Sequence, residues 1–481
     1  MAVRLSRHLR LNKTQAELDF VDVLLNGDMP LFIDPHALGK REDIWSVEAS
    51  NLVVDCFQQV IDHIRRGDDD QAQTILASLK EPNDTGLGLS QNKRQGRGVS
   101  GQQSVDLFDH LKDSTAARTG FLKDLEDCEL LIPGISSDKI SDITTNIIRQ
   151  KLVEYTTDQS ELLGIPTQKV PAGRFWDPHR HEWREEEFAD LPVYKGQRLL
   201  FVPKAIVRHQ MVFDHRQYYN HYVLAFLQAY HLAAATGLVQ LLKNGKRRVT
   251  KKSLKRQNPL SKEFLYQFSK EHPDIFEKYK RDIPAARDRE MSDAALNPSA
   301  GVGPDQVMLL LDKLHAIPAG TAQANAYHDC MVGVLEALFY PSFIYPKKEQ
   351  ALHQGRKRID ITYSNAAKTG FFQWLHAVQH VPCSFIMAEC KNYSADPANP
   401  ELDQLAGRFS VQRGQFGLMV CRTCDDRAVF QQRCRDTALD GRGYILLLVD
   451  ADIEELLMLK ASGREQDIDR WLDGQFRSIV F

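Results

Sequence analysis

The residues best suited to chemistry lie in the C-terminal third of this 481-residue sequence. Asp360 interrupts an apolar run that continues Ile-Thr-Tyr, and Glu389 and Lys391 end the run FIMAECK at 385–391. Residues two apart in a strand project from the same side of a sheet, so Glu389 and Lys391 share one face. The run around them is otherwise apolar and reads as a buried strand, where ionised groups need charged partners or a metal ion.

This set of residue types suits metal-assisted hydrolysis of a phosphodiester. Carboxylates such as Asp360 and Glu389 can hold Mg²⁺ through hard oxygen ligands, and water positions on the ion stay open. The Lys391 ammonium can orient the attacking water or offset charge that grows on the phosphate. Glu336, on a preceding helix, can supply a third carboxylate to the same metal cluster. The alternatives are a buried ion network without a metal and, for Glu336, an ordinary solvated helix end.

The elements around these residues predict an α/β layer structure. Apolar spacing predicts a helix over 321–340 that carries Glu336, and four hydrophobic runs predict strands. Helical patterns separate most of these strands. The predicted strands cover 358–364, 383–393, 416–422 and 444–450, and the intervening helices cover 369–379, 400–410 and 425–437.

The order of a helix with Glu336, a strand with Asp360, a strand with Glu389-Cys390-Lys391 and a following helix resembles the PD-(D/E)XK restriction-endonuclease-like nuclease superfamily. The resemblance covers about 321–449. It implies a mixed sheet flanked by helices, Mg²⁺ (replaceable by Mn²⁺) at Asp360 and Glu389, and Lys391 as the catalytic lysine. Members often carry a glutamine on the helix after the E-x-K strand, and Gln404 matches that position.

The strongest local charge bias is the run 243–256, which has eight basic residues and no acidic one. It follows a predicted apolar helix over 221–242. The whole chain has a formal net charge of −3, so contact with nucleic acid must come from such a local patch. Arg408 lies one helical turn after Gln404, so the two face the same way, either toward phosphate or as an ordinary polar helix face. The alternative for the run is a solvated linker. The residues predicted to bind nucleic acid are Lys246, Arg247, Arg248, Lys251, Lys252 and Arg408.

Length and composition predict a multidomain globular protein, since 43% of the residues are hydrophobic and 26% are charged. We expect a mainly α-helical recognition or sensor domain over 1–160 and an α+β region with the basic run over 161–300. The nuclease-like α/β domain is expected over 301–481. A strand is also predicted at 198–203. The segment 81–104 is rich in Gly, Asn, Gln and Ser and predicts a loop.

The eight scattered cysteines are typical of reduced thiols, and no uncharged apolar run approaches the roughly 18 residues of a membrane span, so a cytoplasmic protein without membrane contact is expected. The leading hypothesis is an Mg²⁺-dependent nuclease, with DNA as the substrate that the resemblance favours. A nuclease joined to a large sensor half is similar to bacterial antiviral or restriction effectors. A homodimer is expected if both strands are cut, and a partner protein of a defence system is the other predicted partner. The alternatives are a catalytically silent nucleic-acid-binding or assembly protein and a sensor that binds a nucleotide through the Gly-rich loop.

Overall fold

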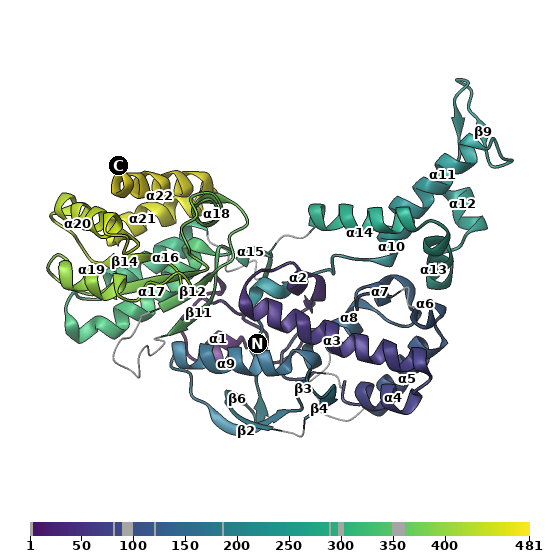
Figure 1. Cartoon of the computed structure of the whole chain (residues 1–481), viewed down its shortest axis with the longest axis horizontal. Coiled ribbons are helices and arrows are strands. Elements are labelled where there is room, and N and C mark those ends of the chain that lie inside the picture. The colour runs from purple at the N-terminus through teal and green to yellow at the C-terminus, as the bar shows by residue number, and fades with distance from the viewer. Residues whose placement is uncertain are drawn as a thin grey trace.

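The computed structural model describes residues 3–79, 82–88, 100–119, 122–184, 187–287, 290–296, 303–348 and 361–481. Asp360 and most of the Gly-rich loop therefore lie outside the described residues. Three parts follow one another along the long axis of the molecule: a C-terminal α/β unit, a largely helical N-terminal body and a projecting arm (Figure 1). No helix in these ranges is long and apolar enough to cross a membrane.

The N-terminal body is built around α3, Ile44–Arg66, which begins at Asp43, whose side chain accepts a hydrogen bond from Ser46 N–H, and ends at Gly67 with φ 80°. Its apolar stripe is buried, as the three- and four-residue spacing predicts. Short two-stranded ladders lie beside the helices. The other elements are α1 Leu5–His8, β1 Phe32–Ile33, α2 Pro35–Gly39, α4 Asp69–Leu76, α5 Ser100–Asp113, α6 Thr115–Arg118, α7 Asp127–Leu131, α8 Ser137–Ile147, α9 Arg149–Leu162, β2 Gln168–Gly173, β3 Trp176–Asp177, β4 Glu182–Trp183, β5 Glu187–Leu191, β6 Val193–Tyr194, β7 Gln197–Arg198 and β8 Val207–Arg208.

The strand predicted at 198–203 is wrong beyond Arg198, where β7 ends. The following apolar residues are buried, but their backbone amides bond to other partners. Leu200 N–H donates to the Asp84 carbonyl at 2.8 Å, and Phe201 N–H donates to the Thr156 hydroxyl at 2.9 Å. A buried backbone needs hydrogen bonds but not a strand partner, so hydrophobicity alone overpredicted a strand.

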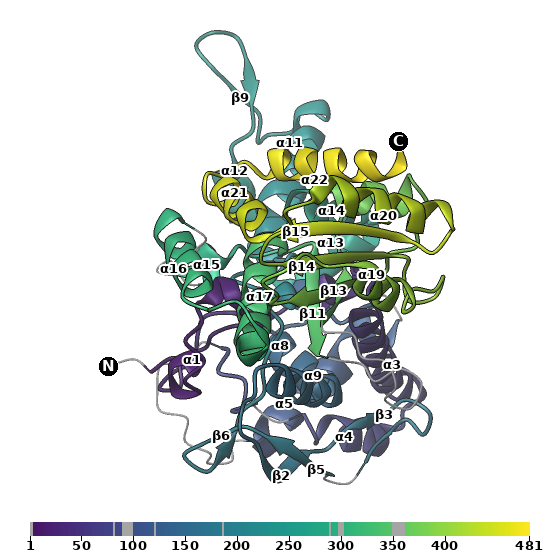
Figure 2. The same ribbon diagram turned by 90° about the vertical axis from the view of Figure 1, so that its left-hand side faces the viewer.

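The arm extends from the body and ends in a hairpin (Figures 1 and 2). The helix predicted over 221–242 is much shorter, because it ends at Ala233 and Ala235 turns to a left-handed φ of 46°. A π-helical turn at Tyr218–Val223 precedes it. The arm elements are α10 His215–Gln217, α11 Leu224–Ala233, β9 Gln240–Leu241, β10 Arg247–Arg248, α12 Lys251–Gln257, α13 Lys262–Glu271 and α14 Pro273–Arg287.

The C-terminal unit is an α/β layer structure around a five-stranded mixed sheet with the order β11-β12-β13-β14-β15. The first two pairings are antiparallel and the last two are parallel. This confirms the multidomain α/β class. The elements are α15 Asp293–Leu296, α16 Pro304–His315, α17 Ala324–Phe339, β11 Phe343–Lys348, β12 Ile361–Asn365, α18 Gly370–Ala377, β13 Phe385–Lys391, α19 Asn399–Ala406, β14 Phe416–Cys421, α20 Arg427–Leu439, β15 Tyr444–Val449, α21 Asp450–Ala461 and α22 Glu465–Val480.

Strand β11 was not predicted from the sequence. It contains Pro346, which cannot donate to a ladder, and its pairing with β12 shifts register between Ile344 and Lys347. Proline and bulges are tolerated at the edge of a sheet, and β11 is an edge strand. A strand of this kind lacks the regular alternation on which sequence reasoning depends.

Buried apolar residues of the described ranges form two cores. One extends through the N-terminal body and the arm and also takes Tyr340, Ile344 and Tyr345 from the C-terminal unit. The other fills the C-terminal unit and also takes Ala16 and Leu162. Each core thus includes side chains from the other part of the chain, so the N-terminal body and the C-terminal sheet pack against each other at a junction. The division at residues 160 and 300 stays a prediction.

A buried charge cluster crosses this junction. Lys204 of the body is fully buried, and its Nζ lies 3.0 Å from Asp293 Oδ1 of α15 and 3.2 Å from Glu336 Oε1 of α17. Burial lowers the pKa of the Lys204 ammonium, but the neighbouring carboxylates outweigh burial and raise it overall. Burial also raises the pKa of Glu336 to about 8, and it raises that of nearby Asp19. We call these four residues the Lys204 cluster.

The raised pKa of Glu336 predicts a pH-dependent stability. The folded state keeps a proton on Glu336 up to about pH 8, whereas the unfolded chain releases it near pH 4.5, so its contribution falls as pH rises through this window. Glu336→Gln removes that dependence. In chemical denaturation, the free energy of unfolding of the wild type should fall by on the order of a few kcal/mol relative to that of the variant between pH 5 and pH 8. Parallel stability curves for the two proteins would contradict this account of the cluster.

Candidate active site

Strand β13 and helix α19 bring four of the predicted site residues together. Lys391 Nζ donates to Glu389 Oε1 at 2.8 Å, and Gln404 Nε2 donates to the same oxygen at 2.8 Å. Arg408 donates to the other carboxylate oxygen, Oε2. Lys391 Nζ also lies 3.5 Å from Gln404 Oε1. We call these four residues the Glu389 cluster.

The local sequence explains this convergence. The alternation along β13 places Glu389 and Lys391 on one face of the sheet. Glu389 pairs with Met419 of the parallel strand β14, and this register fixes how far along the sheet the two side chains lie. Helix α19 begins after Ala398, whose N–H donates to Glu401 at 2.9 Å. Gln404 lies on this helix, and Arg408 follows two residues after its end, so both reach the end of β13.

The Glu389 cluster is buried at its centre and open at its rim. The Glu389 side chain has 0% exposure and that of Arg408 2%, whereas that of Lys391 has 15% and Gln404 is exposed. A buried carboxylate is stable only when charged or hydrogen-bonding partners compensate for lost hydration, and Lys391, Arg408 and Gln404 supply them. Solvent therefore has access from the Lys391 and Gln404 side.

Arg408 has a different role from the one predicted. In place of an exposed phosphate contact, its guanidinium is buried against Glu389. A guanidinium on a helix face cannot be assigned to solvent or to a carboxylate without knowledge of the strand beneath it. Arg408 therefore orients Glu389 and offsets its charge, and contact with a phosphate would first require that ion pair to open.

Glu336 also lies apart from the Glu389 cluster. The Tyr363 hydroxyl donates to the Val332 carbonyl in α17, so the face of the sheet that holds Tyr363 is the α17 face. Tyr363 pairs with Ile386, which by alternation shares its face with Ala388 and not with Glu389. Glu389 thus points to the opposite face, and Glu336 belongs to the Lys204 cluster instead.

Asp360 lies outside the described residues. The described part of β12 begins at the next residue, Ile361, which pairs with Ala388, the residue before Glu389. Asp360, the predicted second carboxylate, directly precedes Ile361 in the sequence, and Ala388, the partner of Ile361, directly precedes Glu389. The role of Asp360 as a metal ligand stays a prediction.

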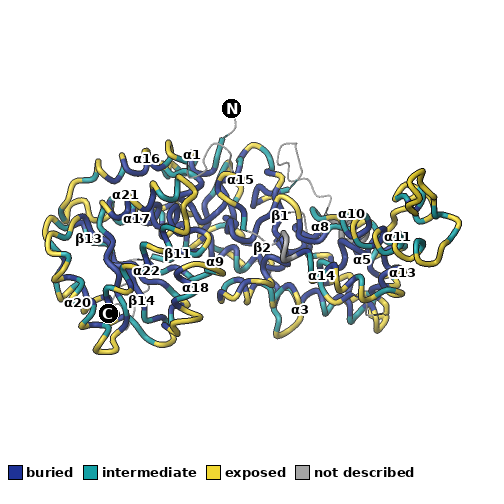
Figure 3. Tube along the Cα trace, turned by 90° about the horizontal axis from the view of Figure 1, so that it is seen from above, coloured by how far each residue is buried: buried dark blue, intermediate teal, exposed yellow. Residues whose placement is uncertain are grey.

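The other five residues predicted to bind nucleic acid form an exposed basic tip on the arm. Lys246, Arg247 and Arg248 lie in the β9–β10 hairpin, and Lys251 and Lys252 begin α12. All five are exposed, and the exposed colour covers the far end of the arm in Figure 3. The structure therefore separates this basic tip from the Glu389 cluster, which lies at the other end of the molecule (Figure 1).

Sequence reasoning missed a polar network at the edge where β13 and β14 end. Asn392 Oδ1 accepts from Arg422 Nε at 2.7 Å, and Asn392 Nδ2 donates to the Gly320 carbonyl at 2.8 Å. Arg422 also bonds Asp450 at 3.0 Å. Asn392 and Arg422 lie at the ends of the strands predicted over 383–393 and 416–422, and parallel strands end at the same edge, so this signal was present in the sequence. The network fixes the end of β13 immediately beyond Lys391.

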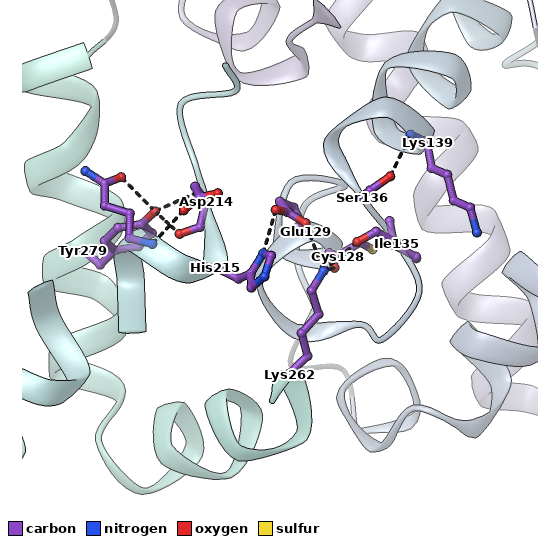
Figure 4. Close-up of polar contacts among 10 residues, drawn as sticks. Cys128, Glu129, Ile135, Ser136, Lys139, Asp214, His215, Lys262 and Tyr279 are labelled. Carbon is purple, nitrogen blue, oxygen red and sulfur yellow. Dashed lines mark hydrogen bonds and ion pairs between the residues drawn. The ribbon is translucent and has the colours of Figure 1, made fainter. Parts of the chain in front are cut away.

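A second group has the composition of a metal site. Ligand atoms of Glu129, Asp214 and His215 lie within 4.8 Å of one another, and no other such group occurs among the described residues. Figure 4 shows that Lys262 points at Glu129 from α13, and its Nζ lies 2.9 Å from Glu129 Oε2. His215 Nδ1 lies 2.9 Å from Glu129 Oε1. Because an ammonium already holds the carboxylate, we interpret the group as the anchor of the arm on α7.

Comparison with known proteins adds little about function. A family model described as a domain of unknown function (DUF8370) matches residues 10–214. The matched segment covers most of the N-terminal body and ends where α10 and the arm begin. No curated protein and no solved structure matches the chain. The chain is thus similar to that family over its N-terminal body, and the C-terminal unit must be interpreted from its own residues.

The pairing of Arg408 with Glu389 predicts that losing Arg408 alone destabilises the fold more than losing both charges together. Arg408→Met leaves the buried Glu389 carboxylate short of a cation and should cost about 3–5 kcal/mol of folding stability. Arg408→Met combined with Glu389→Gln carries no such charge and should be more stable than the single Arg408 variant. Urea denaturation of the three proteins measures this. A loss under about 1 kcal/mol in the single variant would mean that Arg408 does not compensate for the Glu389 charge.

Proposed function

We propose that the protein is a metal-dependent nuclease, with a restriction-endonuclease-like C-terminal unit that hydrolyses phosphodiester bonds of DNA. The observation that carries the proposal is the Glu389 cluster. A carboxylate, an ammonium and an amide converge at the end of a central strand of a mixed sheet, and this end is accessible from one side. The mixed pairing of the sheet supports the proposal, because the resemblance implies a mixed sheet flanked by helices.

The chemistry of the donors fits Mg²⁺ when Asp360 is included. Glu389 offers the hard oxygen that Mg²⁺ prefers, but Lys391 and Arg408 already place two positive charges beside this single carboxylate. A second carboxylate is needed to favour a further cation, and Asp360 is the residue proposed to supply it. Glu389 and Asp360 would hold the ion, which supplies charge stabilisation and an activated water when bound.

The described side chains have distinct tasks in this proposal. Arg408 holds one oxygen of Glu389, so the carboxylate keeps a fixed orientation. Lys391 shares the other oxygen with Gln404 and is the most accessible cation of the cluster. It can orient the attacking water and stabilise negative charge on the phosphate. Gln404 positions Lys391 through its amide oxygen.

The basic tip supports the proposal that nucleic acid is the substrate. Five exposed cations gather on a hairpin and a short helix, where they can contact a phosphate backbone. An exposed tip of this kind can bind nucleic acid whether or not the protein cleaves it. It therefore also favours the second candidate, a catalytically silent nucleic-acid-binding or assembly protein. A role in bacterial antiviral defence or restriction is a further proposal that rests on architecture alone.

Cleavage assays test the nuclease proposal. Plasmid DNA, single-stranded DNA and RNA are incubated with Mg²⁺, Mn²⁺ or EDTA. Asp360→Ala, Glu389→Gln and Lys391→Ala should each lower the cleavage rate by about 10²-fold or more, since each removes a group that acts on the transition state. Asp403→Asn is the matched control, because Asp403 precedes Gln404 on α19 but pairs with Arg442 on the exposed side. Wild-type protein that binds all substrates but cleaves none would favour the silent alternative.

The basic tip should control affinity through salt-dependent binding of phosphates. Replacing Lys246, Arg247 and Arg248 by Ser should weaken DNA binding and lower the slope of log K against log salt by about 0.9 for each phosphate that the tip no longer neutralises. The control changes three exposed cations of the body, Lys40, Lys169 and Arg180, in the same way. Fluorescence anisotropy over a range of salt concentrations measures both. Equal slopes for the two triple variants would show that the tip does not bind the nucleic acid.

A further inference from the structure

A cavity of about 220 Å³ lies between the N-terminal body and the C-terminal sheet. Its walls include Trp45 of α3, Tyr155 of α9, Tyr345 of β11 and Met387 of β13. Pockets for drug-sized molecules usually have about 300–1,000 Å³, so this cavity has room for one ring system and not for a large ligand. We call it the junction cavity.

The aromatic walls are held in place by hydrogen bonds at their polar ends. The Tyr155 hydroxyl donates to Asp19 at 2.7 Å, and the Tyr345 hydroxyl lies 3.1 Å from the Ser46 hydroxyl. The rings of Trp45 and Tyr345 lie 5.0 Å apart with a tilt of 35°. Their polar ends are therefore occupied by the protein. The Tyr155 and Tyr345 rings are buried, and the half-buried Trp45 ring is the surface on which a planar ligand can stack.

Tyr345 reaches this position through an unusual backbone. Its φ is 52°, in the left-handed region that a bulky residue rarely adopts. It lies in the irregular part of β11, where the pairing with β12 shifts register. Bulges re-aim side chains, and residues held in such conformations concentrate at ligand-binding sites. The strand is thus shaped to direct the Tyr345 ring at Trp45.

The wall of the cavity also includes a guanidinium. Arg413 lines the cavity, and the Nε of Arg413 is buried with no hydrogen-bond partner in the described part of the chain. At the rim, Lys151 pairs with Glu48 at 2.6 Å. A guanidinium beside aromatic walls suits a planar ring with acceptor atoms at its edge, because a guanidinium N–H can bond to such an edge.

The position of the cavity links it to the Glu389 cluster. Phe385 and Met387 line the cavity, and they share one face of β13 with Glu389 because alternate residues point the same way. Met387 and Glu389 are one such step apart, about 7 Å along the strand. A nucleotide whose phosphate is at the Glu389 cluster can therefore extend its base toward the junction cavity.

We propose that the junction cavity binds a single nucleobase, which stacks on Trp45 beside Tyr345 and accepts a hydrogen bond from Arg413. The inference rests on the proposed function for the source of the base, an unpaired or extruded nucleotide of the strand to be cut. A free nucleotide offers the same chemistry, and the test distinguishes the two sources. In either case, the base joins the N-terminal body to the sheet that carries the Glu389 cluster.

Binding measurements in EDTA test this without any cleavage. The probes are a labelled single-stranded DNA, the same strand with an abasic position, a duplex and the four nucleoside monophosphates as competitors. Trp45→Ala should weaken single-strand binding about 5- to 150-fold, because base stacking on one aromatic ring is worth about 1–3 kcal/mol. Trp45→Phe should retain most of the affinity, and Arg413→Met should lose part of it. Phe188→Ala, at a ring with 62% exposure on β5, is the control.

The outcomes separate the proposals. Weaker binding in Trp45→Ala and Arg413→Met but not in the control, together with weaker binding of the abasic strand, supports a base of the substrate. Binding of free nucleotides alone that depends on Trp45 supports the site and assigns it to a nucleotide ligand. Equal binding by all variants and by the abasic strand overturns the inference. Wild-type protein that shows Trp45-dependent binding but cuts no substrate refutes only the nuclease proposal.

Discussion

The structure depends on one buried ammonium that joins the two halves of the molecule. Lys204 comes from the N-terminal body, and its carboxylate partners Asp293 and Glu336 come from α15 and α17 of the C-terminal region. A buried charge that loses its partner is far more costly than an exposed one, so the relative placement of body and sheet is restricted to arrangements that keep these contacts. Burial raises the pKa of Glu336 most, and the nearby carboxylates of Asp19 and Asp293 raise it further.

This constraint reaches the candidate active site through the sheet. Helix α17 covers one face of the sheet, and the Glu389 cluster lies on the other. Helices α3 and α9 of the body line the junction cavity beside β13. The body therefore packs against the strand that carries Glu389. The family match over residues 10–214 falls on this part of the chain.

Much of the C-terminal unit could be predicted because its strands are short apolar runs bounded by turns and helices. Glu389, Lys391 and Gln404 could be grouped for the same reason, since strand alternation and helix order fix which side chains meet. The partners of Arg408 and Glu336 could not, because each depends on which face of a helix meets a distant element. Lys204 is 132 residues from Glu336 in the sequence, and no local pattern indicates their pairing.

The edge strand β11 shows the other limit of sequence reasoning. Its proline and its irregular pairing hide it from a search for alternation, yet they shape one wall of the junction cavity. The backbone φ of Tyr345 follows from tertiary contacts around its buried ring and not from local preference. Residues that depart from local conformational preferences are thus hard to predict from the sequence, and such residues are expected at binding sites.

The most direct test of the central claim is the position of a bound metal ion. Crystals grown with Mn²⁺ and a short DNA that resists cleavage would locate the ion by anomalous scattering. The account predicts a peak within coordination distance, about 2–2.5 Å, of a Glu389 carboxylate oxygen and of Asp360, and no such peak in the Glu389→Gln protein. A peak at Glu129 and His215 with none at Glu389 would contradict it.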